Sequence, residues 1–239
     1  MTKANSRKRL EGRVALVTGA SRGIGAAVAR GFAAEGAHVI LLARTQGALE
    51  AVDDEIREAG GTATLMPFDL IATSRIDGIG PTIAERFKRL DIFVGNAAIL
   101  GNLSPVAMSD TKDFDRVFKT NFLANYRLIR TLDPLLRGSD AGRAIFVTSG
   151  AAHMNNQFWG AYAASKAALE TMVATYAAEA AHSPLKVNII DPGVVRTGMR
   201  KDAFPAEDPE TLPPPESVVE RFIGLAAPTC AKTGELIAA

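Results

Sequence analysis

The sequence has little of what marks a metalloprotein, a disulfide-bonded protein or a membrane protein. Its 239 residues include one cysteine, Cys230, and three histidines, which stand far apart at His38, His153 and His182. One cysteine excludes a disulfide within these residues, and no cluster has the spacing of metal ligands. No apolar run approaches the roughly 20 residues of a transmembrane helix. Because residues 1–30 also lack the pattern of a secretory leader, we expect a cytoplasmic protein with no metal and no membrane partner.

An excess of charge of one sign is also missing. The 27 Lys and Arg residues balance the 26 Asp and Glu residues, so no overall field attracts nucleic acid. The one basic run lies at residues 3–9, and we interpret residues 1–10 as a solvated tail rather than a binding arm. With 47% hydrophobic residues, residues 11–239 suit one globular domain with a large core.

Short apolar runs alternate with longer alanine-rich, amphipathic runs. The apolar runs lack polar alternation, which is typical of parallel strands covered on both faces. The pattern predicts an α/β fold, a Rossmann-like doubly wound parallel sheet flanked by helices on both faces, in a single domain. The expected strands are 14–18, 38–43, 63–68, 91–94, 143–148, 186–190 and 234–238, and the expected helices are 24–35, 46–59, 73–88, 113–136 and 160–182.

Residues 198–215 interrupt this alternation. The segment contains five prolines and mixed charges, which predicts irregular structure. An irregular segment of this length inside a domain is usually a functional lid or a disordered excursion. We interpret it as a lid over a substrate.

The segment T-G-A-S-R-G-I-G, residues 18–25, follows the first strand and opens the first helix. Gly19, Gly23 and Gly25 permit a tight turn, close approach of a pyrophosphate and close packing of helix on strand. The N-terminus of the following helix favours an anion. The spacing G-x3-G-x-G differs from the common G-x-G-x-x-G fingerprint, so a purely structural turn stays open as an alternative.

The end of the second strand indicates which nicotinamide nucleotide would fit. Sites selective for NAD carry an acidic residue about twenty positions after the glycine loop. This strand ends instead in Ala43, Arg44 and Thr45. The guanidinium of Arg44, with Arg22 of the glycine loop, would bind a 2′-phosphate. We therefore favour NADP(H) over NAD(H), with two ordinary surface arginines as the alternative.

Tyr162 and Lys166 stand one helical turn apart in an alanine-rich run, which places them side by side. A phenol has a pKa of about 10. An ammonium about 4 Å away supplies roughly 4 kcal/mol at an effective dielectric of about 20, enough to bring that pKa to about 7. Ser149, at the end of a strand, could hold a substrate oxygen beside the phenol or cap a helix. Asn121, inside a helical pattern, is explained by a kink holding a water near Lys166 or by a bridge between helices.

Together these motifs resemble the short-chain dehydrogenase/reductase family along essentially the whole chain. Further matches are D-L at 69–70, N-A at 96–97 and D-P-G-V-V-R-T at 191–197, and A-F-P-A-E-D-P at 203–209 resembles a bacterial subgroup of uncharacterised oxidoreductases. The resemblance implies that Asn121, Ser149, Tyr162 and Lys166 form a catalytic tetrad. With the two arginines, the implied cofactor site consists of Gly19, Ser21, Arg22, Gly23, Ile24, Gly25, Arg44, Asp69, Leu70, Asn96, Ala97, Tyr162, Lys166, Pro192, Gly193, Val195 and Thr197.

The implied reaction is hydride transfer between NADP(H) and a ketone, an aldehyde or a secondary alcohol. Ser149 would position the carbonyl oxygen and Tyr162 would donate the proton, which Lys166 and a water at Asn121 would replenish. One alternative is a nucleotide-binding regulatory or scaffold protein with little activity. A nucleotide-sugar epimerase or dehydratase fits the glycine spacing and the chain length less well.

Substrate contacts are expected from residues 99–102, from residues 151–159 and from the lid. Leu100, Met154, Phe158 and Trp159 suggest an apolar pocket for a small-molecule substrate.

Two departures from the family pattern stand out. The usual N-N-A-G reads G-N-A-A, with Gly95 and Ala98 as the changed residues; Ala98 could crowd the nicotinamide. The family implies a homodimer or homotetramer, but the ending T-G-E-L-I-A-A lacks the frequent D-G-G, which counts against a tetramer formed through the last strand.

Overall fold

Seven parallel strands form one sheet in the computed structural model, which describes residues 8–238. Their order is β3-β2-β1-β4-β5-β6-β7, so the direction of the crossovers reverses between β1 and β4. The strands are β1 (Val14–Thr18), β2 (His38–Ala43), β3 (Thr62–Pro67), β4 (Ile92–Gly95), β5 (Arg143–Val147), β6 (Lys186–Asp191) and β7 (Leu236–Ala238).

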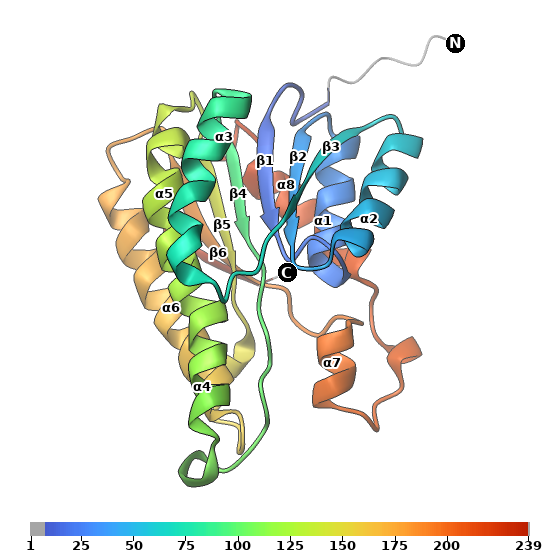
Figure 1. The fold of residues 1–239 in the computed structure, drawn as a ribbon, viewed down its shortest axis with the longest axis vertical. Coiled ribbons are helices and arrows are strands. Elements are labelled where there is room, and N and C mark those ends of the chain that lie inside the picture. The colour runs from blue at the N-terminus through green and yellow to red at the C-terminus, as the bar shows by residue number, and fades with distance from the viewer. Residues whose placement is uncertain (1–7, 239) are drawn as a thin grey trace.

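Helices cover both faces of the sheet (Figure 1), with α1, α2 and α8 on one face and α3, α5 and α6 on the other. Figure 1 also shows α4 and α7 beyond the carboxyl ends of the strands. The helices are α1 (Gly23–Ala34), α2 (Gln46–Glu58), α3 (Ile79–Phe87), α4 (Thr111–Phe118), α5 (Ala124–Gly138), α6 (Gly160–Glu179), α7 (Gly198–Ala203) and α8 (Val219–Ala226). Shorter helical turns are η1 (Thr73–Gly78), η2 (Val106–Met108), η3 (Lys119–Leu123), η4 (Gly150–Ala152), η5 (Pro209–Thr211) and η6 (Pro215–Val218).

Successive residues of the central strands face opposite helical layers. In β1, Ala15 and Val17 pack with α1, α2 and α8, whereas Val14 and Leu16 pack with α5 and α6. A central strand must therefore be apolar at every position, which explains the runs without polar alternation. The predicted fold class is confirmed, and every predicted strand is present with ends within two residues of the expected ones.

Two predicted helices are interrupted. The helix expected at 73–88 consists of η1 followed by α3, because Gly78, Gly80 and Pro81 disfavour a continuous α-helix there. The helix expected at 113–136 begins at Thr111 and changes register through the π-helical turn η3 before it continues as α5.

Two helices are missing from the prediction. Residues 198–203 of the expected irregular segment form α7, whose N-terminus is capped by the Thr197 hydroxyl. The helix α8 buries Phe222, Ile223 and Ala226, and η6 just before it buries Val218. These apolar residues have helical spacing, so the sequence after the prolines contained a pattern from which α8 could have been predicted.

Two residues of the predicted N-terminal tail, Arg9 and Leu10, pack on the domain. Residues 1–7 lie outside the described residues. The Arg9 guanidinium pairs with Glu35 at 2.7 Å and with Glu220 at 2.5 Å. Leu10 is completely buried and its N–H donates to the Glu35 carbonyl. Arg9 and Leu10 therefore belong to the domain.

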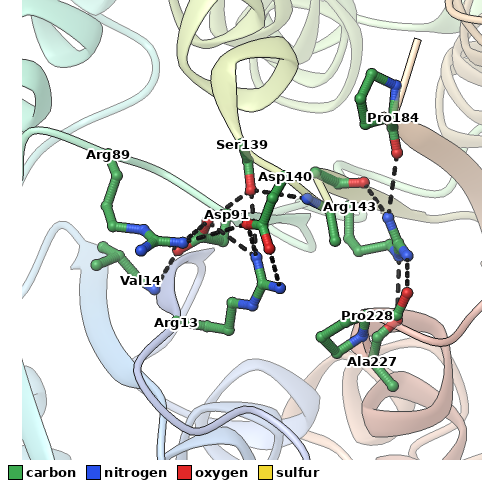
Figure 2. Close-up of polar contacts among 12 residues, drawn as sticks. Arg13, Val14, Arg89, Asp91, Ser139, Asp140, Arg143, Pro184, Ala227 and Pro228 are labelled. Atoms are coloured by element: carbon green, nitrogen blue, oxygen red, sulfur yellow. Dashed lines mark hydrogen bonds and ion pairs between the residues drawn. The ribbon is translucent and has the colours of Figure 1, made fainter.

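A buried carboxylate, Asp91, ties the amino ends of β1, β4 and β5 together (Figure 2). It accepts hydrogen bonds from the Val14 N–H at 2.9 Å and the Ser139 hydroxyl at 2.6 Å. It also pairs with Arg89 at 2.6 Å and with Arg13 at 3.3 Å. Burial alone would raise the pKa of Asp91, but the hydrogen bonds from Arg89, Ser139 and Val14 hold that pKa below its ordinary value.

Arg143, beside this cluster, also links several segments of the chain through buried hydrogen bonds (Figure 2). Only 3% of the residue is exposed. Its guanidinium donates to the backbone carbonyls of Gly142, Pro184, Ala227, Pro228 and Cys230. These bonds fasten the segment after α8 to the start of β5.

We expect Asp91→Ala to lower the free energy of unfolding by about 3 kcal/mol, because it leaves the Val14 N–H and the Ser139 hydroxyl buried without their acceptor. Urea denaturation followed by circular dichroism at pH 7 measures the loss. Because the folded-state pKa of Asp91 is lowered, its contribution is present above about pH 4 and disappears as the pH falls below that value.

Asp140→Ala is the matched control for this measurement. Asp140 also pairs with Arg13, at 2.6 Å, but its side chain is 73% exposed. Its removal should cost less than about 1 kcal/mol. Equal losses for the two variants would contradict the assignment of Asp91 as the central group.

Candidate active site

A cavity of about 650 Å³ opens at the carboxyl ends of the strands. Its walls are the loops that follow β1 to β5, together with the start of α6 and the segment from the end of β6 into α7. The cavity lies where the strand order reverses, which is where open α/β sheets bind ligands.

The Thr18 hydroxyl fixes the junction of β1 and β4 at the base of this cavity. It donates to the Val94 carbonyl at 3.1 Å and accepts from the N–H groups of Asn96 and Ala97 at 3.0 and 3.1 Å. Asn96 in turn donates from Nδ2 to the Thr18 carbonyl at 2.9 Å. The loops after β1 and β4 are thereby held side by side.

The glycine loop after β1 forms a close cradle. Gly19 and Gly23 have φ values of +67° and +56°, which favour glycine. A Cβ on Gly25 would lie 2.2 Å from the Gly19 carbonyl oxygen, so α1 can approach the loop only with glycine there. No side chain caps the N-terminus of α1 after Arg22. Its N–H groups can bind an anion, so the cradle fits the pyrophosphate of a dinucleotide.

Two guanidinium groups lie at the β2 end of the cavity. Arg22 and Arg44 both line it and are exposed, and neither is ion-paired to another residue among 8–238. Asp69 lines the same end, but its Oδ1 accepts a hydrogen bond from the Ile71 N–H at 3.0 Å within its own turn. The two guanidinium groups of Arg22 and Arg44 suit a bound phosphate group.

Ser149, Tyr162 and Lys166 line the other end of the cavity. Lys166 is 2% exposed, and its Nζ donates to the Val147 carbonyl at 2.8 Å. The same Nζ lies 5.8 Å from the centroid of the Tyr162 ring. The Ser149 hydroxyl accepts from the Ala151 N–H at 3.3 Å, so this serine also caps the short helix η4.

Burial is the largest effect on the pKa values of Tyr162 and Lys166. It raises the pKa of Tyr162 to about 12, against the opposing effect of the Ser149 hydroxyl. It also lowers the pKa of Lys166 to about 8. The pKa of Tyr162 in this structure therefore lies above its ordinary value and not near the expected 7, because burial of the phenol is the largest effect on it. At pH 7 the tyrosine keeps its proton and the lysine its charge.

Asn121 stands apart from the other three predicted catalytic residues. It is fully buried in η3, behind the cavity wall. Its Oδ1 accepts from the Ile99 N–H at 2.9 Å, and its Nδ2 donates to the Ile99 carbonyl and to Ser165 Oγ, both at 3.0 Å. The Asn121 side chain thus bridges the loop after β4 to α6, which agrees with the second of the two explanations offered above.

The predicted cofactor residues line the cavity, apart from Gly25, which packs against the Gly19 carbonyl outside the cavity wall. The changed residue Gly95 has a packing reason. A Cβ there would lie 2.6 Å from Asn125 Oδ1 and 2.8 Å from the Phe146 ring, so no larger side chain fits. Ala98 lines the cavity.

The substrate end differs from the prediction in part. Leu100 and Trp159 line the cavity, whereas Met154 and Phe158 are 63% and 51% exposed and lie outside its wall. Phe204, which belongs to the predicted lid, also lines the cavity, with its ring centroid 5.7 Å from that of Trp159.

Four polar lining residues were not named in the predicted site: Thr120, Thr148, Asp191 and Arg200. Asp191 opens the D-P-G motif, which was a usable signal, and its Oδ1 accepts from the Gly193 N–H at 2.9 Å. Arg200 belongs to the predicted lid, although it was not named there, and it lies 3.8 Å from the centroid of the Phe204 ring.

Comparison with known proteins decides the family. The sequence profile of the short chain dehydrogenases matches residues 13–208. The chain belongs to the short-chain dehydrogenase family. It is similar to the uncharacterized oxidoreductase YciK of Escherichia coli K12, with 38% identity over 219 residues that cover 90% of this chain and 86% of that protein. The predicted resemblance is confirmed, and this short-chain dehydrogenase is an oxidoreductase by family.

Solved structures of short chain dehydrogenases have the same fold as this chain. A short chain dehydrogenase from Pseudomonas syringae superposes with a TM-score of 0.94 at 35% identity, covering 100% of this chain and 98% of the other. One from Escherichia coli CFT073, in complex with NADPH, superposes with a TM-score of 0.93 at 37% identity, covering 98% of each chain.

Residues 8–238 show neither a metal site nor a membrane-spanning helix. No group of three His, Cys, Asp or Glu side chains in this range is placed to hold a metal ion. None of the helices there has the length and apolarity needed to cross a membrane.

We expect Gly25→Ala to weaken nucleotide binding by at least about tenfold, because the new methyl group would displace the Gly19 carbonyl and open the cradle. Titration of the quenching of intrinsic fluorescence by NADPH measures this. Gly224→Ala is the control: it also lies in a helix, but nothing stands within 4 Å of its added Cβ. It should leave binding unchanged and stabilise the fold by up to about 1 kcal/mol.

Proposed function

We propose that this short-chain dehydrogenase transfers hydride between NADP(H) and a ketone, an aldehyde or a secondary alcohol, as a carbonyl reductase or alcohol dehydrogenase. One observation carries the proposal: Tyr162 and Lys166 lie at one end of a single cavity that has Arg22 and Arg44 at the other. A dinucleotide with its adenosine toward the arginines would have its nicotinamide beside the tyrosine.

Three features support NADP(H) as the cofactor. The glycine cradle fits a pyrophosphate, Arg22 and Arg44 are suited to a 2′-phosphate, and no acidic residue follows β2 directly. A solved relative that is 37% identical is described in complex with NADPH.

In the reductive direction, bound NADPH supplies hydride for the carbonyl carbon. The Ser149 hydroxyl donates a hydrogen bond to the carbonyl oxygen and holds it beside Tyr162. Tyr162, protonated at pH 7, donates its proton to that oxygen. The Lys166 ammonium stabilises the phenolate that remains, since opposite charges attract strongly in a buried site.

The lining of the substrate end favours an apolar substituent on the carbonyl carbon. Trp159 lies 5.8 Å from Tyr162, ring centroid to ring centroid, and Phe204 and Leu100 complete an apolar wall. Burial of apolar substrate surface against these side chains would contribute to binding.

We expect Tyr162→Phe to lower turnover by about 10²- to 10⁴-fold, the usual contribution of a general acid, and to change the dissociation constant of NADPH by less than about twofold. The assay follows NADPH consumption with ketones, aldehydes, quinones and 3-oxoacyl thioesters. Near-normal turnover in the variant would contradict the mechanism. NADPH binding without turnover of any compound would favour the nucleotide-binding regulatory or scaffold protein instead.

We expect Arg44→Asp to reduce the preference for NADPH over NADH by at least about tenfold, because a carboxylate repels the 2′-phosphate. The dissociation constants of both nucleotides give this ratio. Arg130→Asp makes the same charge change on α5 outside the cavity wall and should leave the ratio unchanged. An unaltered ratio in Arg44→Asp would remove the basis for assigning NADP(H).

A further inference from the structure

Glu170 continues the catalytic face of α6 by one more turn. Tyr162, Lys166 and Glu170 are each four residues apart, so their side chains follow one another along the helix surface. The Glu170 side chain is only 12% exposed. A carboxylate so little exposed is costly unless hydrogen-bond donors surround it.

Both oxygens of Glu170 have partners, and those partners flank Ser149. Glu170 Oε1 accepts a hydrogen bond from the Thr148 hydroxyl. Its Oε2 lies 2.9 Å from His153 Nε2. Thr148 directly precedes Ser149, and His153 ends the short helix η4 that Ser149 caps. One carboxylate therefore contacts both ends of the turn that carries the serine.

The same carboxylate lies beside Lys166. The charged or titratable groups facing Lys166 are Tyr162 and Glu170 on α6 and Asp191 at the end of β6, with His153 on the far side of Glu170. Burial lowers the pKa of Lys166, whereas Glu170 and Asp191 act to raise it. Asp191 already accepts a hydrogen bond from the Gly193 N–H.

We propose that Glu170 is a positioning residue of this active site, which holds the Thr148–His153 turn under Ser149 and keeps a negative charge beside Lys166. Its importance for turnover rests on the proposed function. Its effects on Lys166 and on the turn can be measured without any substrate.

The charge is tested with Glu170→Gln, which retains an oxygen for the Thr148 hydroxyl but loses the negative charge. We expect the pKa of Lys166 to fall by about 1. NMR titration of the protein labelled at lysine Cε measures this pKa, with the Lys166 signal assigned by its loss in Lys166→Met. The control is Glu179→Gln, the same substitution at an exposed position of the same helix, which should leave the pKa of Lys166 unchanged.

The hold on the turn is tested with Thr148→Val, which removes one hydrogen bond and preserves the side-chain shape and the charge of Glu170. We expect amide hydrogen exchange of residues 149–153 to become at least about fivefold faster, the effect of losing one hydrogen bond, with the pKa of Lys166 unchanged. A merely structural loss would instead raise exchange throughout the sheet.

The proposal is overturned if Glu170→Gln leaves the pKa of Lys166 unchanged, if Glu179→Gln lowers it equally, or if Thr148→Val leaves exchange in the turn unaltered. Where a carbonyl substrate is turned over, the alkaline decline of turnover should move to lower pH in Glu170→Gln by the same amount as the pKa. Failure of the proposed function appears separately, in the comparison of Tyr162→Phe with the native enzyme.

Discussion

The hydrogen bonds of the Thr18 hydroxyl hold together the two loops at the base of the cavity. The strand order reverses between β1 and β4, so the chain leaves these two strands toward opposite faces of the sheet. Thr18 holds the loop after β4 against the loop after β1. The glycine loop and the segment that Asn121 holds through Ile99 therefore line one cavity, and the proposed catalytic residues Tyr162 and Lys166 line the same cavity from α6.

The two ends of the sheet use polar groups in opposite ways. At the amino ends, Asp91 and Arg143 are surrounded by partners, and their contacts are directed inward to the fold. At the carboxyl ends, Lys166 has three N–H donors and one hydrogen bond to a residue among 8–238. The remaining donors are available to a ligand. The buried polar groups that stabilise the fold thus lie at the amino ends of the strands, and those with free hydrogen-bonding capacity lie at the carboxyl ends.

The sequence was informative where a physical requirement recurs with a fixed period. The buried strands, the glycine loop and the spacing of Tyr162 and Lys166 were predictable because each has a local cause. The protonation of Tyr162 was not, because its pKa depends on burial by residues distant in sequence. The partners of Glu170 were equally hidden, since Thr148 and His153 approach it only when β5 lies beside α6. Helix α7 was obscured by the prolines around it.

The regular spacing along α6 makes this helix intolerant of changes in length. Tyr162, Lys166 and Glu170 contact three successive residues at the end of β5, which are Ser149, Val147 and Thr148 respectively. Inserting or deleting one residue between them would rotate everything beyond that point by about 100° and turn the later side chains away from their partners. Residues 205–215 carry no comparable register, because they form only short turns outside the sheet. A change in the length of that segment should therefore leave the strands and α6 in place, whereas the interval from Tyr162 to Glu170 has to stay constant.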